Sequence, residues 1–177
     1  MSAKAHVTGV GMVPFQKPGA SESYDVMAAK ATRSALQDAG LSYDLIQQAY
    51  VGYVYGDSTC GQRALYQVGM TGIPILNVNN NCSTGSSALF LARQAVESGA
   101  VECVLALGFE QMKPGAIGSV LEDRVSPFQS FDDETDDLVG CPEIPLALRY
   151  FGGAGKAHME EFGTTLETFA KIRAKSS

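Results

Sequence analysis

The sequence lacks three features that assign many chains to a class: long apolar runs, paired cysteines and an excess of basic charge. No stretch approaches the roughly 20 apolar residues of a membrane-spanning helix, and no secretory signal pattern is present. The four cysteines are widely spaced, with no C-x-x-C pair, which disfavours a zinc site or a disulfide framework. These are Cys60, Cys82, Cys103 and Cys141. The net charge of −6 argues against non-specific partners such as nucleic acid or anionic membranes. We therefore expect an intracellular protein in a reducing compartment.

Signals for a metal or a nucleotide are also weak. The acidic run at 132–137 is typical of a solvated loop rather than of a metal site. The two short Gly-x-Gly stretches lack the spacing of a dinucleotide-binding turn. We expect no metal and no permanently bound cofactor.

The periodicity that is present predicts an α/β fold. A length of 177 residues with 45% hydrophobic residues is enough for one globular domain with its own core. Strands are predicted at 5–12, 49–55, 73–78 and 102–108, and helices at 24–39, 61–68, from Cys82 to 99, at 146–162 and at 166–175. This alternation predicts a parallel or mixed sheet covered by helices. Residues 111–145 carry no periodic signal, and loops of that length are uncommon unless functional or disordered.

The most informative stretch contains Cys82. It follows an apolar run that predicts a buried strand, and small residues with a helical pattern come after it. A thiol at the first turn of a helix lies near the positive end of the helix dipole, which favours the nucleophilic thiolate. The small residues would let another backbone or a long ligand approach closely. From the residues alone, an inert buried cysteine remains an equal alternative.

Several neighbours of this stretch also have two interpretations. Asn79, Asn80 and Asn81 could simply satisfy the backbone of a turn. Glu110 and Met112 follow a predicted strand, a position that often faces the site in α/β sheets, although local packing is the simpler explanation. Lone basic residues such as Arg63 and Lys113 could meet phosphates but usually lie on the surface.

The order of motifs resembles that of thiolases, in particular the thiolase domain of sterol carrier protein X and related bacterial lipid-transfer thiolases. The segment NNNCSTGSSAL at 79–89 is similar to their nucleophile segment. Further matching segments are VTGVGM at 7–12, VGYVYGDSTCGQRA at 51–64, GMTGIP at 69–74, LALGFEQM at 105–112 and FGTT at 162–165. The resemblance runs through essentially the whole chain and implies the N-terminal half of a thiolase-like fold.

The resemblance implies a site and its partners. Cys82 would be the nucleophile, and its backbone amide would donate to the oxyanion. We expect Asn81, Ser83, Gly85, Glu110 and Met112 to border the substrate. The co-substrate would be coenzyme A, the substrate an acyl-CoA, and the assembly a homodimer with residues 79–81 near its two-fold axis.

The resemblance also implies a division of the chain. Residues 1–110 would form the α/β core, 111–145 a loop region over the active site, and 146–177 its helical end. The family's second half supplies a GHP-type histidine, another histidine motif and a second cysteine, none of which is matched here. His6 and His158 are the only histidines, and both are better explained as surface or packing residues. We therefore expect the chain alone to be poorly active and to need a second half or a partner chain.

The function implied is that of a 3-ketoacyl-CoA thiolase in the degradation of fatty acids or sterol side chains. Two alternatives remain open. One is a thiolase-fold retro-aldolase acting on steroid side chains, which the retained Cys82 disfavours. The other is a non-catalytic lipid-binding subunit. We expect a cytoplasmic location, or a peroxisomal one in a eukaryote.

Overall fold

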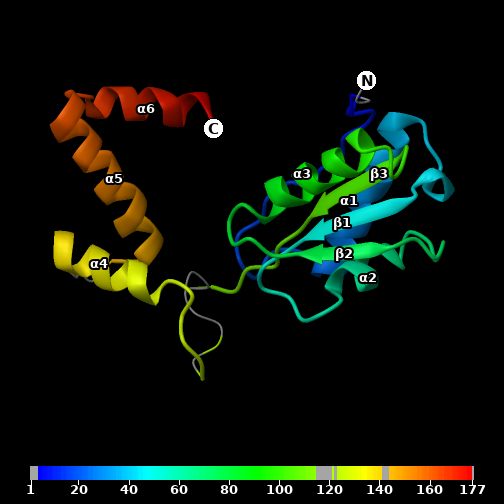
Figure 1. The fold of residues 1–177 in the computed structure, drawn as a ribbon, viewed down its shortest axis with the longest axis horizontal. Coiled ribbons are helices and arrows are strands. Elements are labelled where there is room, and N and C mark those ends of the chain that lie inside the picture. Colours follow the sequence, from blue (N-terminus) through cyan, green and yellow to red (C-terminus); the bar gives the residue numbers. More distant parts are fainter. Residues whose placement is uncertain (1–3, 115–120, 122, 141–143, 177) are drawn as a thin grey trace. The chain divides into compact units, whose positions relative to one another are not determined.

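The computed structural model describes residues 4–114, 121, 123–140 and 144–176. The chain divides into two compact units, residues 1–114 and 115–177. The first unit holds the sheet and the second is helical (Figure 1). Cys141 lies outside the described residues, and the other three cysteines are free thiols.

The first unit is built on a three-stranded parallel sheet. Its strands are β1 (Gln48–Gly52), β2 (Ile75–Val78) and β3 (Val104–Gly108), in the order β2-β1-β3. The expected α/β class is confirmed, whereas a mixed sheet is wrong for the described strands, because both strand pairs are parallel.

Helices cover both faces of this sheet, with α3 (Thr84–Glu97) on one face and α1 (Tyr24–Ala39) and α2 (Cys60–Leu65) on the other (Figure 1). Alternate side chains of a strand point to opposite faces. Accordingly, Val51 packs in the core beneath α1 and α2, whereas Tyr50 packs against α3.

The predicted helix at 24–39 is confirmed at both ends as α1. Gly40 adopts the left-handed conformation, with φ of 65°, and its amide and that of Leu41 donate to carbonyls of the last turn. Glycine is favoured there because it has no Cβ to oppose a positive φ.

The predicted first strand, 5–12, is wrong: residues 4–17 form no regular element. This segment lies against α1 instead. The Val10 amide donates to Asp38 of α1 at 2.9 Å, and a Cβ added at Gly9 would lie 2.5 Å from the Ala35 carbonyl oxygen. The lack of a side chain at Gly9 therefore lets this backbone lie against the helix. The Val10 amide, which could have paired in a sheet, donates to Asp38 instead.

The strand before Cys82 is confirmed, but its predicted burial is wrong. β2 is an edge strand with a single neighbour, and its Leu76 side chain is 40% exposed. An apolar run predicted burial on both faces, but position at the sheet edge determined the exposure.

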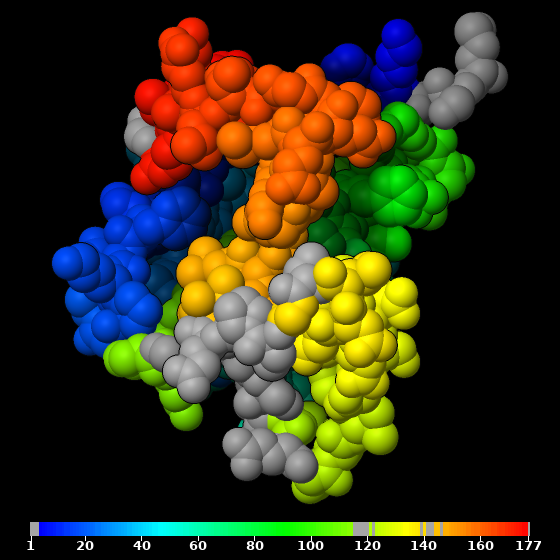
Figure 2. All heavy atoms as spheres, turned by 90° about the vertical axis from the view of Figure 1, so that its left-hand side faces the viewer, coloured from blue at the N-terminus to red at the C-terminus, as the bar shows by residue number. Residues whose placement is uncertain are grey.

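The second unit contains α4 (Gln129–Val139), α5 (Leu146–Phe162) and α6 (Leu166–Lys175). The bounds of α5 and α6 match the prediction, but α4 lies inside the segment 111–145 that was predicted to lack periodic structure. Arg149 of α5 pairs with Asp136 of α4. Figure 2 shows the atoms of α4 (yellow) beside the first turns of α5 (amber). The helix α4 was missed because its middle is an acidic run, 132–137, which hides the apolar spacing.

Candidate active site

The candidate site lies at one edge of the parallel sheet. Gly52, Val78 and Gly108 end the three strands in matching register. Because parallel strands present their carboxyl ends at a common edge, the segments that follow them lie at that edge. These segments are 53–59, 79–83 and 109–114, which carry every predicted site residue except Gly85. Gly85 belongs to the first turn of α3, the helix that follows the second segment.

The turn that carries Cys82 is held by its own polar side chains. The Thr84 hydroxyl accepts a hydrogen bond from the Asn80 amide at 2.8 Å and donates to the Asn81 carbonyl at 2.6 Å. The Ser83 hydroxyl donates to the Asn80 carbonyl at 2.8 Å. Thr84 is 4% exposed, so its two bonds are partly shielded from water, whereas the Ser83 bond is exposed.

The asparagines act in this turn as the simpler interpretation predicted. The Asn79 side-chain oxygen accepts from the Asn81 amide at 3.2 Å, and the Asn80 side chain donates to the Ser87 hydroxyl. Asn81 has a φ of 48°, in the left-handed region that asparagine tolerates better than most residues. This conformation reverses the chain directly before the cysteine.

Cys82 is exposed, with its sulfur 3.9 Å from the Asn81 side-chain oxygen. It precedes Ser83, the N-cap of α3, so its predicted place in the first helical turn is wrong. The amides of Ser83 and Thr84 already donate to the carbonyls of Asn80 and Asn81. The thiol therefore projects from a closed turn before the helix, and the alternative of a buried core cysteine is wrong.

Small residues at this edge allow α3 to pack closely on the strand ends. A Cβ added at Gly52 would lie 2.6 Å from the Thr84 methyl carbon, and one added at Gly108 would lie 3.8 Å from the Gly85 Cα. A Cβ added at Gly85 would meet nothing within 4 Å, so that side of the helix start is open. The small residues serve helix packing and leave open space beside Gly85.

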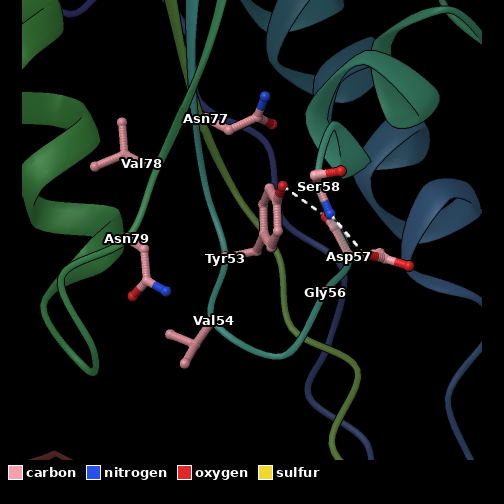
Figure 3. Close-up of a pocket in the computed structure, with 8 residues that line it drawn as sticks. All are labelled: Tyr53, Val54, Gly56, Asp57, Ser58, Asn77, Val78 and Asn79. Atoms are coloured by element: carbon pink, nitrogen blue, oxygen red, sulfur yellow. Dashed lines mark hydrogen bonds between the residues drawn. The ribbon is translucent and has the colours of Figure 1, made fainter. Parts of the chain in front are cut away.

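Two pockets open beside these segments. One, of about 180 Å³, is lined by the loop after β1 and by the end of β2 (Figure 3). Its lining residues are Tyr53, Val54, Gly56, Asp57, Ser58, Asn77, Val78 and Asn79. Figure 3 shows the Tyr53 ring between β2 and the loop, with its hydroxyl donating to the Asp57 carbonyl at 2.8 Å. Asn79 connects this pocket to the Cys82 turn, although Cys82 itself is not among the lining residues.

The second pocket, of about 410 Å³, is lined by the segment after β3 and by the start of α1. Glu110 and Met112 line it, together with Tyr24, Cys60 and Phe109. A hydrogen bond with the buried Cys60 thiol is the main cause that raises the pKa of Tyr24 to about 12. Cys60 is conspicuous in the sequence motif at 51–64, but no sequence signal placed Tyr24 at a pocket.

Arg63 does not extend freely toward a ligand. Its Nε donates to Asp25 at 3.0 Å. A hydrogen bond from Ser23 is the main cause that lowers the pKa of Asp25, burial opposes it, and Arg63 lowers it further. The structure therefore agrees better with Arg63 as a surface residue than with Arg63 as a phosphate ligand.

The described histidines lie outside the segments that form this edge. His6 is exposed on the N-terminal segment, and the His158 ring contacts that of Phe162 within α5, with ring centroids 4.7 Å apart and the planes tilted by 46°. Across the part of the chain that the structure describes, no three His, Cys, Asp or Glu side chains gather as metal ligands would. Among the described helices, none has both the length and the apolar character needed to cross a membrane.

Comparison with known proteins adds to this geometry. Residues 4–136 match the sequence model of the family described as "Thiolase, N-terminal domain". The chain is 53% identical over 176 residues to "Sterol carrier protein 2" of Homo sapiens, an alignment covering 98% of this chain and 32% of that protein.

Two further relatives have different names. The chain is 44% identical to "Non-specific lipid-transfer protein-like 2" of Caenorhabditis elegans, over 98% of this chain and 43% of that one. It is 31% identical to "Benzoylsuccinyl-CoA thiolase subunit BbsB" of Thauera aromatica, over 99% of this chain and 43% of that one. The chain thus spans about a third to less than half of the length of these relatives.

Proposed function

The chain belongs to the thiolase family, in the region of its N-terminal domain, and on that premise we propose that it acts in thiolysis of 3-ketoacyl-CoA with Cys82 as nucleophile. The observation that carries the proposal is the exposed thiol on a hydrogen-bonded turn at the carboxyl edge of a parallel sheet. Ligands of open α/β sheets bind at such edges.

The chemistry proceeds in two transfers. The Cys82 thiolate attacks the 3-keto carbon, and the bond between carbons 2 and 3 breaks. The electron pair leaves as the enolate of acetyl-CoA or propanoyl-CoA, which takes up a proton. The acyl group, now a thioester on Cys82, passes to the thiol of a second coenzyme A.

Proton transfer needs groups beyond this turn. Neither His6 nor His158 lies in a segment that matches a histidine motif of the family. The proposal therefore takes the base, and the acid that protonates the enolate, from a second thiolase half, and it includes assembly as a homodimer. A lipid or sterol-derived acyl-CoA as substrate is supported by relatives named for sterol carriage and lipid transfer.

The test is intact mass with peptide mapping after the protein is mixed with a 3-ketoacyl-CoA or acyl-CoA. We expect one acyl adduct, on the peptide that contains Cys82. The Cys82→Ala variant should form none, and Cys103→Ala, which removes a half-buried thiol before β3, should form the same adduct as the parent protein. An adduct that persists in Cys82→Ala would refute the nucleophile.

A second candidate, non-catalytic lipid binding, is favoured by the names of the same relatives. It predicts that Cys82→Ala leaves every activity of the assembled protein unchanged. The nucleophile predicts a loss of thiolysis by at least about 10³-fold, since covalent catalysis has no substitute once the thiol is gone. A retro-aldolase would also tolerate the loss of Cys82, and its cleavage of a β-hydroxyacyl-CoA would separate it from lipid binding.

A further inference from the structure

The segment that follows β3 is linked to the loop that follows β1 by a carboxylate. One oxygen of Glu110 accepts a hydrogen bond from the Val54 amide at 2.9 Å, and the other accepts from the Tyr55 amide at 3.0 Å. Backbone amides that lie outside a ladder need a partner, and a carboxylate is among the strongest acceptors available. Glu110 therefore satisfies two successive amides of an irregular loop.

The neighbours of Glu110 strengthen the same connection. The Phe109 ring lies between those of Tyr24 and Tyr53, with centroids 5.1 Å from each. Its backbone amide donates to the Gly52 carbonyl at 3.1 Å. The Gln111 side chain accepts from the Tyr24 amide at 2.9 Å. Three consecutive residues thus bind the end of β1, its loop and the start of α1.

The loop held in this way forms one wall of the pocket beside the nucleophile turn. Val54, Gly56 and Asp57 line it opposite Asn79, the residue from which the Cys82 turn begins (Figure 3). Gly56 and Asp57 also line the larger pocket. A shift of this loop would therefore change the shape of both pockets without touching Cys82.

We propose that Glu110 is a positioning residue of the thiolase site: it holds the loop 53–57 in place, so that the pocket beside the Cys82 turn is formed before the substrate arrives. This inference rests on the proposed function. Each carboxylate oxygen accepts from a backbone amide, that of Val54 or of Tyr55, so the role proposed for Glu110 is to hold the loop rather than to bind the substrate. Glu110 acts on substrate binding and leaves the reactivity of the thiol unchanged.

The substitution that tests this is Glu110→Gln. A glutamine of the same shape offers one acceptor oxygen and an NH₂ group, which cannot accept from an amide N–H, so one of the two bonds is lost. Hydrogen exchange of the Val54 and Tyr55 amides should become about tenfold faster, as expected for the loss of one charge-assisted bond. Glu102→Gln is the matched control, since it makes the same charge change before the amino end of β3 on an exposed side chain.

The second measurement separates binding from reactivity at Cys82. Acylation by an acyl-CoA is followed by intact mass over a range of concentrations, which yields a half-saturation concentration and a maximal rate. Glu110→Gln should raise the half-saturation concentration about fivefold or more, because a loop must be ordered on binding. Its maximal rate, and the rate at which iodoacetamide alkylates Cys82, should stay within about twofold of the parent protein, as expected for a residue that acts on binding alone.

The outcomes are distinguishable. Unchanged exchange, or faster exchange with unchanged half-saturation, overturns the inference while the proposed function stands. A parallel fall in the maximal rate and in alkylation also overturns it, because the thiol itself would then be affected. If the parent protein forms no adduct even when it is assembled with a second thiolase half, the proposed function fails and the positioning role fails with it.

Discussion

The two units of this chain are built in opposite ways. In residues 1–114, apolar side chains from the sheet and three helices are buried, including Val51, Leu65 and Ala88. In the described part of residues 115–177, the charged side chain of Arg149 is buried. Large apolar side chains there are exposed. The exposed ones include Leu138, Leu148, Phe151, Phe162, Leu166 and Ile172.

The difference shows where folding energy resides. Burial of apolar surface is the main favourable term in folding, and among the described residues the buried apolar clusters lie in the first unit. The second unit forms helices whose apolar side chains face water, as amphipathic helices do before they meet a partner surface. The candidate site belongs to the first unit, where a rigid sheet can hold a turn in place.

The largest effect that would test this contrast is the truncation of one leucine in each unit. Leu65 is fully buried, so Leu65→Ala should lower the free energy of unfolding by about 2–5 kcal/mol. Leu148 is 62% exposed, so Leu148→Ala should change it by less than about 0.5 kcal/mol. Urea unfolding can be followed by circular dichroism, since both units contain helices that contribute to the signal. Equal costs would contradict the contrast.

A smaller effect is expected from alanine substitutions at two glycines, one in each unit. At Gly52 an added Cβ would lie 2.6 Å from the Thr84 methyl carbon, so Gly52→Ala should push α3 from the sheet and destabilise by about 1–3 kcal/mol. Because Thr84 holds the Cys82 turn, its amides should also exchange faster. At Gly153, inside α5, a Cβ would meet nothing, so Gly153→Ala should stabilise its helix by about 0.5–1 kcal/mol. Hydrogen exchange by unit would reveal both changes, and a stabilised Gly52→Ala would show that the close packing is absent.

The smallest effect depends on pH. The pKa of Asp25 is lowered, chiefly by a hydrogen bond from Ser23. Asp25 therefore stabilises the fold above its unfolded pKa, near 3.9, and this contribution disappears as the pH falls through the lower folded value. The deficit of Asp25→Asn relative to the parent protein should shrink between pH 5 and about pH 3.

Asp123 is the control for this prediction in the second unit. A hydrogen bond from Arg124 lowers the pKa of Asp123 too, but its side chain is 70% exposed. Exposed pairs of this kind contribute little to stability, so Asp123→Asn should be neutral at every pH. A deficit of Asp25→Asn that is constant with pH would show that Asp25 acts through packing rather than through its charge.

Much of the fold could be predicted because local signals agreed with tertiary placement. The helix 24–39 has apolar spacing and a glycine at its end, and the structure ends α1 at that glycine. The parallel strands were predicted from their alternation with helices. The first strand failed for the opposite reason: Val7 and Val10 are typical of a strand, but the Val10 amide donates to Asp38, a partner far along the chain.

The candidate site could be predicted only in part. Cys82 could be singled out from its place between a strand and a run of small residues, since both features are local. Its exposure could not, because that depends on what the closed fold places around the turn. The roles of Glu110 and Tyr24 could not be predicted either, since they depend on hydrogen bonds between residues far apart in the sequence. Glu110 and Val54 are separated by 56 positions, and Tyr24 and Gln111 by 87.

The sequence by itself determined the α/β class, most of the helices and the position of the nucleophile candidate, because these depend on periodicity and on neighbours along the chain. Only the tertiary structure decided that Cys82 is exposed, that Glu110 holds a loop, and that Gly52 admits Thr84. The physical reason is range: strand and helix patterns repeat within a few residues, whereas a pocket is made by side chains that only the closed fold brings within hydrogen-bonding distance.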